Sequence, residues 1–162
     1  MSEATAAPLV TVLCTGNICR SPMGERLLAH ALAAEDGPLQ GVRVVSAGVS
    51  AYPGDPASPN SVKALAKVGL DLNDHRSRRF DHRLLDESTL VLVMTEGHRA
   101  FIREIYGETD TPVLLFRELM PDTAQPEVPD PFGASLPDYL ETRDAIMEAI
   151  PSIVTWLRER VK

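Results

Sequence analysis

The chain has 162 residues, of which 44% are hydrophobic and 24% are charged, and this composition is typical of a soluble globular protein. Its formal net charge of −7 argues against a nucleic-acid partner, because phosphate backbones favour basic protein surfaces. The sequence has neither a run of roughly 18 apolar residues nor a cationic leader with an apolar centre, and we therefore expect a cytoplasmic protein with no membrane span.

The first predicted element is a buried strand over residues 9–13, where all five side chains are aliphatic or β-branched. The eight residues before it are small or polar and show no hydrophobic periodicity. We therefore expect a flexible N-terminus over 1–8 and one domain over 9–162. No internal repeat or low-complexity segment indicates a second domain.

A sharp turn must follow this strand, because a helix is predicted to begin only a few residues later. Ser21 and Pro22 mark that beginning, since serine is a common N-cap and proline favours the first helical position. Gly16 and Asn17 lie inside the turn and are residue types that tolerate a positive φ. A loop curled in this way can point several backbone N–H groups at one spot.

Such a loop suits an anion of phosphate size. The end of a strand that leads into a helix N-terminus collects backbone N–H groups, and the helix dipole there favours negative charge. Arg20 can bind two oxygens of the anion with its planar guanidinium. Cys14 begins the loop, and the surrounding positive partial charges favour the thiolate form of its side chain, which is a nucleophile.

Two other interpretations of this loop are excluded, one by a missing residue pair and one by spacing. A nucleotide-binding Walker A loop needs a Gly-Lys pair, which is missing here. A thioredoxin-like redox motif places two residues between its cysteines, whereas four residues separate Cys14 from Cys19. The chain has no other cysteine, so it has no disulfide framework, and a reducing compartment is expected.

The rest of the chain alternates between helical and strand patterns. The predicted elements are a helix over 22–35, a strand over 42–47, a loop over 48–59, a helix from 59 to 69, a helix over 81–87, a strand over 89–94, a helix from 95 to 106, a strand over 112–116, an irregular segment over 117–136 and a last helix after it.

This alternation predicts an α/β fold: a single three-layer α/β/α domain with a central four-stranded parallel sheet. The phosphate-binding loop follows the first strand. In such sheets ligands bind beyond the carboxyl ends of the strands, which is where the Cys14 loop lies.

The residues resemble the low-molecular-weight protein tyrosine phosphatase family. The family signature of a cysteine, five residues, an arginine and a serine or threonine corresponds here to the segment from Cys14 to Ser21. The resemblance covers most of the chain, because further segments follow in the family's order: Ser46-Ala47-Gly48, the stretch from Gly69-Leu70-Asp71 to His75-Arg76, and Asp130-Pro131-Phe132.

The resemblance implies roles for individual residues. Cys14 is expected to be the nucleophile, Arg20 the phosphate clamp and Asp130 the general acid. Ser21 is expected to stabilise the thiolate, and Asn17 with His75 to support the loop. The remaining loop residues expected to bind phosphate are Thr15, Gly16, Ile18 and Cys19.

Two aromatic residues are expected near the substrate. In the family, the segment around Tyr52 lines a wall of the active-site crevice, although an ordinary surface tyrosine fits the sequence equally well. Phe132 follows the expected acid. Taken alone, Asp130-Pro131 is an ordinary turn dipeptide, and its functional reading depends on the resemblance.

Cys19 has two possible roles. In a curled loop it lies close enough to Cys14 to form a reversible disulfide, which would protect the thiolate under peroxide. The alternative is that Cys19 is a small buried hydrophobic residue.

The expected function is hydrolysis of phosphotyrosine in proteins through a cysteinyl-phosphate intermediate, by a monomer or weak dimer. No metal or cofactor is required, because Arg20 and the loop amides supply the positive field. Protein arginine phosphatases of the same fold are the main alternative; they resemble this chain at Phe132 but carry threonine where it has Ile18. Arsenate reductase is a remote alternative, because its redox cycle needs a further cysteine that this chain does not have. A phosphate-binding module without activity is also remote, because such a module would lack Cys14, Arg20 or Asp130, and all three are present.

Overall fold

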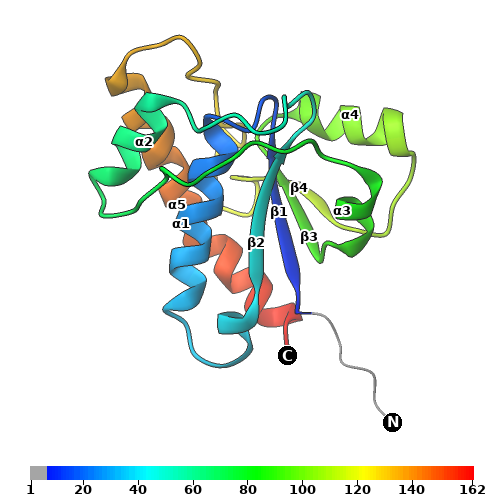
Figure 1. Cartoon of the computed structure of the whole chain (residues 1–162). Coiled ribbons are helices and arrows are strands. Elements are labelled where there is room, and N and C mark those ends of the chain that lie inside the picture. Colours follow the sequence, from blue (N-terminus) through cyan, green and yellow to red (C-terminus); the bar gives the residue numbers. More distant parts are fainter. Residues whose placement is uncertain (1–6) are drawn as a thin grey trace.

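The computed structural model describes residues 7–162, and it contains a four-stranded parallel sheet in the order β2-β1-β3-β4 (Figure 1). The strands are β1 (Leu9–Cys14), β2 (Arg43–Gly48), β3 (Leu90–Val93) and β4 (Val113–Leu115). The predicted flexibility of 1–8 falls mostly outside the described residues. The four predicted strands are all present.

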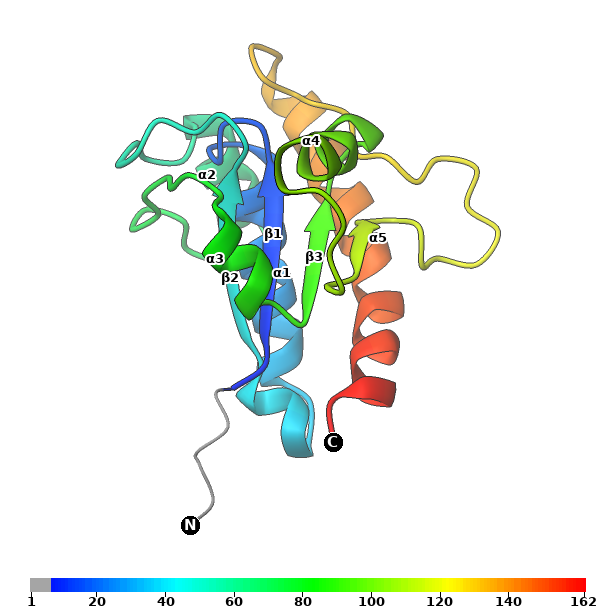
Figure 2. The ribbon, with the colours of Figure 1, turned by 90° about the vertical axis from the view of Figure 1, so that its right-hand side faces the viewer.

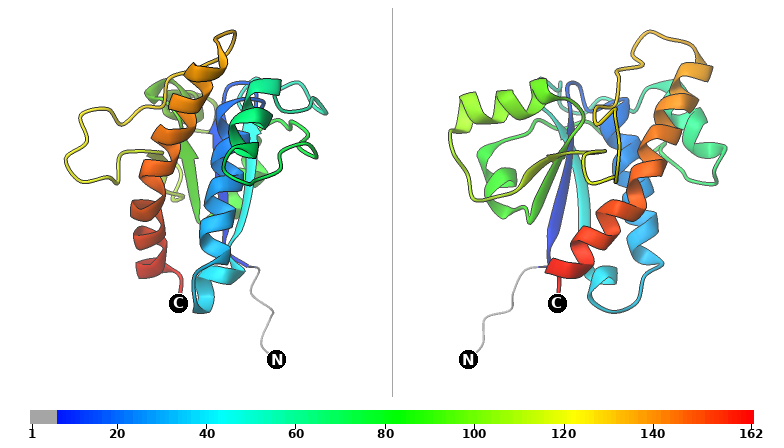
Figure 3. Two further views of the ribbon diagram at one scale, coloured as in Figure 1. Left: turned by 90° about the vertical axis from the view of Figure 1, so that its left-hand side faces the viewer. Right: turned by 180° about the vertical axis from the view of Figure 1, so that it is seen from behind.

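Helices cover both faces of this sheet, which confirms the three-layer prediction. Figure 2 looks onto the face that carries α3 (His82–Glu87) and α4 (Glu96–Tyr106). The opposite face carries α1 (Arg20–Ala33), α2 (Pro59–Ala66) and α5 (Leu136–Arg160), with α1 and α5 packed against each other (Figure 3). A short 3-10 helix, η1 (Gly37–Gly41), leads into β2.

Strand β1 divides its side chains between two hydrophobic cores. Val10 and Val12 pack into the core beneath α1 and α5, whereas Leu9 and Leu13 pack into the core beneath α3 and α4. Successive side chains of a strand point to opposite faces, so a strand buried on both faces is mostly apolar. This is the physical reason why residues 9–13 show no polar alternation. The one polar side chain of residues 9–13, Thr11, is fully buried and shares a hydrogen bond with the Ser88 hydroxyl at 2.8 Å.

The beginning of α1 differs from the prediction. The helix begins at Arg20, and Cys19 rather than Ser21 occupies the N-cap, so the prediction that Ser21 caps this helix is wrong. The Ser21 hydroxyl is instead hydrogen-bonded inside the preceding loop, to Cys14 and Asn17. No side chain caps α1, and its first N–H groups therefore stay available to an anion.

Gly48, the last residue of β2, allows the loop after β1 to lie close to the sheet. It pairs with Cys14 in the strand register, and a Cβ atom at this position would lie 2.5 Å from the Thr15 carbonyl oxygen. No other amino acid fits here without displacing the loop.

The segment between β4 and α5, residues 116–135, has no helix or strand, as predicted for 117–136. Two backbone hydrogen bonds join it to the end of β3: the Phe116 N–H donates to the Val93 carbonyl oxygen at 2.8 Å, and the Val128 N–H donates to the Met94 carbonyl oxygen at 2.9 Å. Both Phe116 and Val128 are fully buried. Within residues 7–162, no helix has both the length and the apolar composition needed to cross a membrane.

Candidate active site

The loop after β1 is built around Asn17. Its φ of 57° makes it the left-handed residue of the turn, whereas Gly16 does not have a positive φ. The Asn17 side chain donates to the hydroxyls of Ser21 at 2.8 Å and Ser46 at 2.9 Å, and accepts from the Arg78 backbone N–H at 2.8 Å. Asn17 is fully buried, so these bonds replace those it would make with water.

His75 supports the same residue from the other side of the loop. Its Nε2 atom lies 2.7 Å from the Asn17 carbonyl oxygen, and the imidazole is 5% exposed. A ring nitrogen this close to a carbonyl oxygen must carry a hydrogen, so His75 donates. The structure therefore brings Asn17 and His75 together, as the resemblance implies.

Cys14 lies at the start of the loop, and its Sγ atom is 3.0 Å from the Ser21 Oγ atom. Because Asn17 already donates to that oxygen, the hydrogen of the Ser21 hydroxyl is left for an acceptor. The alternative acceptor is the Ala47 carbonyl oxygen, at 3.4 Å. The shorter contact to sulfur is suited to a thiolate, which can only accept.

Arg20 is nearly fully buried, with 3% exposure. Its Nη1 donates to the Val128 carbonyl oxygen at 2.9 Å, and its Nη2 lies 3.7 Å from Asp130 Oδ2. Its Nε–H group is buried and has no hydrogen-bond partner among the residues described. A buried, charged donor without an acceptor is costly, and here it indicates a site for an anion.

Asp130 is half exposed, with 48% of its side chain accessible. Its Oδ1 accepts a hydrogen bond from the Phe132 backbone N–H at 3.0 Å, which closes a tight turn. The carboxylate therefore lies above Arg20 at the end of a turn, in contact with solvent.

These residues share one cavity of about 220 Å³. Its lining consists of loop residues from 14 to 20 together with two residues of the acid-bearing turn: Cys14, Thr15, Gly16, Ile18, Cys19, Arg20, Asp130 and Phe132. Tyr52 does not line this cavity, and its side chain is 77% exposed. Its place in the crevice stays a prediction.

Cys19 faces the protein core. Its Sγ lies 3.4 Å from the Tyr139 hydroxyl on α5 and 3.6 Å from the Ser58 hydroxyl, and both cysteines are free thiols. Burial raises the pKa of Cys19, which keeps it protonated, and burial with the Cys19 contact raises the pKa of Tyr139 to about 12. The reversible disulfide with Cys14 stays a prediction.

Sequence reasoning missed two residues at this site, Tyr139 and His98. The His98 Nε2 atom lies 2.9 Å from the Thr15 hydroxyl, next to the nucleophile. Burial, reinforced by the positive charge of Arg20, lowers the pKa of His98 to about 4. A cue was present in the sequence, because Thr95, the first residue of the helix predicted over 95–106, precedes His98 by three residues, the spacing of a capping box.

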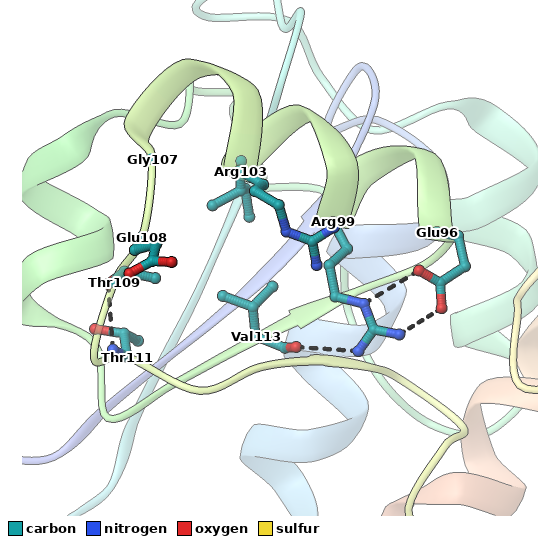
Figure 4. Close-up of a pocket in the computed structure, with 9 residues that line it drawn as sticks. Glu96, Arg99, Arg103, Gly107, Glu108, Thr109, Thr111 and Val113 are labelled. Atoms are coloured by element: carbon teal, nitrogen blue, oxygen red, sulfur yellow. Dashed lines mark hydrogen bonds and ion pairs between the residues drawn. The ribbon is translucent and has the colours of Figure 1, made fainter.

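A second hollow, of about 480 Å³, lies between α4 and β4 (Figure 4). Its most prominent side chain, Arg99, is paired with Glu96 and, at 2.8 Å, with Glu118, and it also donates to the Val113 carbonyl oxygen. The guanidinium is thus already neutralised. No cysteine lines this hollow, so it offers none of the chemistry of the smaller cavity. Across residues 7–162, no group of three or more His, Cys, Asp or Glu side chains could hold a metal ion.

Comparison with known proteins supports the same reading. A family model described as low molecular weight phosphotyrosine protein phosphatase matches residues 9–162. A protein-arginine-phosphatase of Bacillus subtilis (strain 168) is 35% identical over 150 residues, which cover 93% of this chain and 97% of the relative. The probable low molecular weight protein-tyrosine-phosphatase EpsP of Ralstonia nicotianae is 31% identical over 149 residues, which cover 92% and 95%.

Among solved structures, the tyrosine phosphatase Wzb from Escherichia coli K30 in complex with sulphate is similar, with a TM-score of 0.80 and 32% identity. The match covers 92% of this chain and 97% of that one.

Proposed function

Because the chain belongs to the low molecular weight phosphotyrosine protein phosphatase family, we propose that it hydrolyses phosphotyrosine in proteins through a phosphorylated Cys14. One observation carries this proposal: the buried Nε–H group of Arg20 lacks an acceptor in the described part of the chain. A phosphoryl group in the cavity beside Cys14 supplies that acceptor. The sulphate bound by the Wzb relative has the same tetrahedral shape and charge type.

In the first step, the Cys14 thiolate attacks phosphorus, and the bond between phosphorus and the tyrosine oxygen breaks. Asp130 gives its proton to the leaving oxygen. The Ser21 hydroxyl holds the thiolate in place at 3.0 Å before attack. Arg20 and the loop amides stabilise the charge on the equatorial oxygens, an effect of several kcal/mol in other enzymes.

In the second step, water attacks the phosphorus of the cysteinyl phosphate. The Asp130 carboxylate takes a proton from that water, and Cys14 leaves as a thiolate. Inorganic phosphate is released, and both residues return to their starting forms. The charges needed come from Arg20 and the amides of Thr15, Gly16, Ile18 and Cys19, so these steps require neither metal nor cofactor.

The cavity lining favours an aromatic leaving group. Ile18 presents only methyl and methylene groups, and Phe132, which is 69% exposed, offers a ring surface at the mouth. An arginine side chain would leave guanidinium donors unpaired against these groups, at a cost of about 1 to 3 kcal/mol. Tyr52 is proposed as a further wall of the crevice, where its exposed ring would flank the substrate.

Phosphoarginine is the second candidate substrate. The Bacillus subtilis relative is named as an arginine phosphatase, and Phe132 matches the acid loop of that branch. Thr15 also lines the cavity, and the second lone pair of its hydroxyl oxygen, beside the one that faces His98, is an acceptor for a guanidinium N–H. We favour phosphotyrosine because Ile18, not Thr15, stands where arginine phosphatases carry threonine.

The first test is hydrolysis of p-nitrophenyl phosphate by the purified protein in the presence of EDTA. Phosphotyrosyl and phosphoarginyl peptides of matched sequence are then supplied in competition, and the ratio of their kcat/KM values is measured. We expect tyrosine to be preferred, and Ile18→Thr to shift the ratio toward arginine. Ile18→Val is the matched control, because valine has the shape of threonine without its hydroxyl. A wild-type preference for phosphoarginine would overturn the assignment.

We also infer that the protein works in the cytoplasm on phosphorylated proteins, as a monomer or weak dimer. The two free, buried thiols support a reducing compartment. Fractionation of cells and the mass of the purified protein in solution test these two points.

A further inference from the structure

A buried histidine of α4 contacts the residue that follows the nucleophile. His98 lies in the first turn of α4 and is 5% exposed, and its Nε2 atom is 2.9 Å from the Thr15 hydroxyl. The two residues are 83 positions apart in sequence. This is a direct side-chain link between α4 and the catalytic loop.

The hydrogen bonds of His98 determine which ring nitrogen carries a hydrogen. The Thr95 backbone N–H donates to Nδ1 at 3.2 Å, so Nδ1 must be an acceptor without a hydrogen. Burial and the charge of Arg20 keep the ring neutral at pH 7, against the opposing influence of Asp130 and Glu127. The remaining hydrogen of the neutral ring is therefore on Nε2, and His98 donates to Thr15.

This bond directs the Thr15 hydroxyl. The Thr15 Oγ1 atom accepts the hydrogen bond from His98, so the hydrogen of the Thr15 hydroxyl points away from His98, toward another acceptor. Thr15 lines the cavity that Cys14, Arg20 and Asp130 share. Because the Thr15 hydroxyl oxygen already accepts from His98, the hydroxyl is suited to donate its hydrogen to an anion in that cavity. We propose that His98 is a positioning residue that makes the Thr15 hydroxyl a hydrogen-bond donor to the phosphoryl group of the substrate, an inference that rests on the proposed function.

A purely structural role for His98 is the competing explanation. Thr95 and His98 form a reciprocal capping box, in which the Thr95 side chain also accepts from the His98 backbone N–H at 3.3 Å. Loss of this cap would destabilise α4 without touching the reaction. The test must therefore separate the contact of Nδ1 with the cap from the contact of Nε2 with Thr15.

Two substitutions make this separation. In His98→Gln, the amide nitrogen reaches the position of Nε2 and keeps a donor for Thr15, but the cap acceptor is lost. In His98→Asn, the amide oxygen replaces Nδ1 and keeps the cap, but the donor for Thr15 is lost. We expect His98→Asn to lower kcat/KM on a phosphotyrosyl peptide roughly tenfold, which is the effect of losing one hydrogen bond to a charged group. We expect kcat/KM of His98→Gln to stay within about threefold of wild type.

The inhibition constant of vanadate, a phosphate analogue, should rise in parallel for His98→Asn. Wild-type kinetics in His98→Asn, or equal losses in the two variants, would overturn the proposal. Thr95→Ala removes the other half of the same cap and is the control, with kcat/KM expected to stay near wild type.

A double-mutant cycle tests the link to Thr15. Thr15→Val removes the hydroxyl and keeps the branched shape. In this background His98→Asn should cause no further loss of kcat/KM, because its effect runs through the hydroxyl. Losses that multiply would show that the two residues act independently, and would overturn the proposal.

A third readout does not depend on activity. The ¹⁵N resonances of the His98 ring, assigned by comparison with His98→Gln, report which nitrogen is protonated at pH 7. We expect a hydrogen on Nε2 and none on Nδ1; a hydrogen on Nδ1, or a charged ring, would overturn the proposal. If the wild type hydrolyses no phosphotyrosyl substrate but the ring is in the expected form, the proposed function fails and the orientation of Thr15 by His98 stands.

Discussion

The catalytic loop and the acid-bearing segment are held in opposite ways. In the loop, Asn17 is fully buried and four polar contacts fix its side chain and carbonyl. In the segment over 116–135, Asp130 is half exposed, although Val128 and Pro131 on either side of it are buried. Arg20 joins the two regions, because it extends from the loop and donates to the Val128 carbonyl.

The difference follows from what each region has to do in the proposed reaction. The nucleophile and the anion site must be in place before substrate arrives, since positioning after binding would cost catalytic power. The acid must meet leaving groups of varied shape and also exchange a proton with water. A half-exposed carboxylate on a turn whose neighbours Val128 and Pro131 are buried meets both needs.

The largest expected effect is that of Cys14→Ser. Turnover should be abolished, because the hydroxyl keeps the shape of the site but ionises far too weakly to attack phosphorus. Vanadate binding, measured by calorimetry, should persist, because Arg20 and the braced loop are untouched. Residual activity above about 1% of wild type would remove Cys14 from the role of nucleophile.

Asp130→Ala should lower kcat by about 10² to 10⁴ for alkyl and peptide substrates with poor leaving groups. The loss should be smaller for p-nitrophenyl phosphate, whose leaving group needs little protonation. Because the Asp130 side chain is half exposed, the free energy of unfolding should hardly change. Equal losses on both substrates would mean that Asp130 is structural and that another group is the acid.

Asn17→Ala tests the bracing of the loop. It removes three side-chain hydrogen bonds and places alanine at a φ of 57°, so the free energy of unfolding should fall by roughly 2 to 4 kcal/mol, measured in urea. Asp122→Ala is the matched control, because Asp122 has the same φ of 57° but lies exposed in the segment over 116–135. If the two variants lose equal stability, backbone strain and not the hydrogen-bond network is responsible.

The smallest expected effect is the pH dependence due to His98. Its pKa is about 4 in the folded protein and near 6.5 when unfolded, so between these values the unfolded chain binds a proton that the folded protein does not. The stability of the folded state must therefore fall as pH falls through this window, by roughly 2 kcal/mol from pH 7 to pH 5.

Thermal or urea unfolding at the two pH values measures this fall. His98→Gln should reduce it, whereas substitution of the exposed His30 by glutamine should leave it nearly unchanged. The pKa of His98 also depends on the charges of Arg20, Asp130 and Glu127. A parallel measurement in Glu127→Gln shows how much of the loss of stability is due to the charge of Glu127.

Sequence reasoning succeeded where neighbouring residues carry the information. The apolar run of β1, the turn at Asn17 and the conversion from strand to helix are local, and each was predictable from a few adjacent side chains. Ser21 was misread because local statistics describe its preference for N-caps, whereas a buried bond to Cys14 decides its place.

The missed contacts join residues that are far apart in sequence. His98 meets Thr15 across 83 positions, and Tyr139 meets Cys19 across 120. Neither contact can be found without the strand order and the placement of α4 and α5 on opposite faces. The sequence did predict that α4 begins at Thr95, but not that its first turn faces the carboxyl end of β1.

Gly48 has no functional group, yet this position should tolerate substitution as poorly as the position of the nucleophile. Because a single methyl group there would overlap the Thr15 carbonyl oxygen, every substitution displaces the loop that carries Cys14. A saturation screen scored on activity should therefore show position 48 to be as intolerant as position 14. A screen scored only on abundance should separate the two, since the damage at Gly48 is steric and that at Cys14 is chemical.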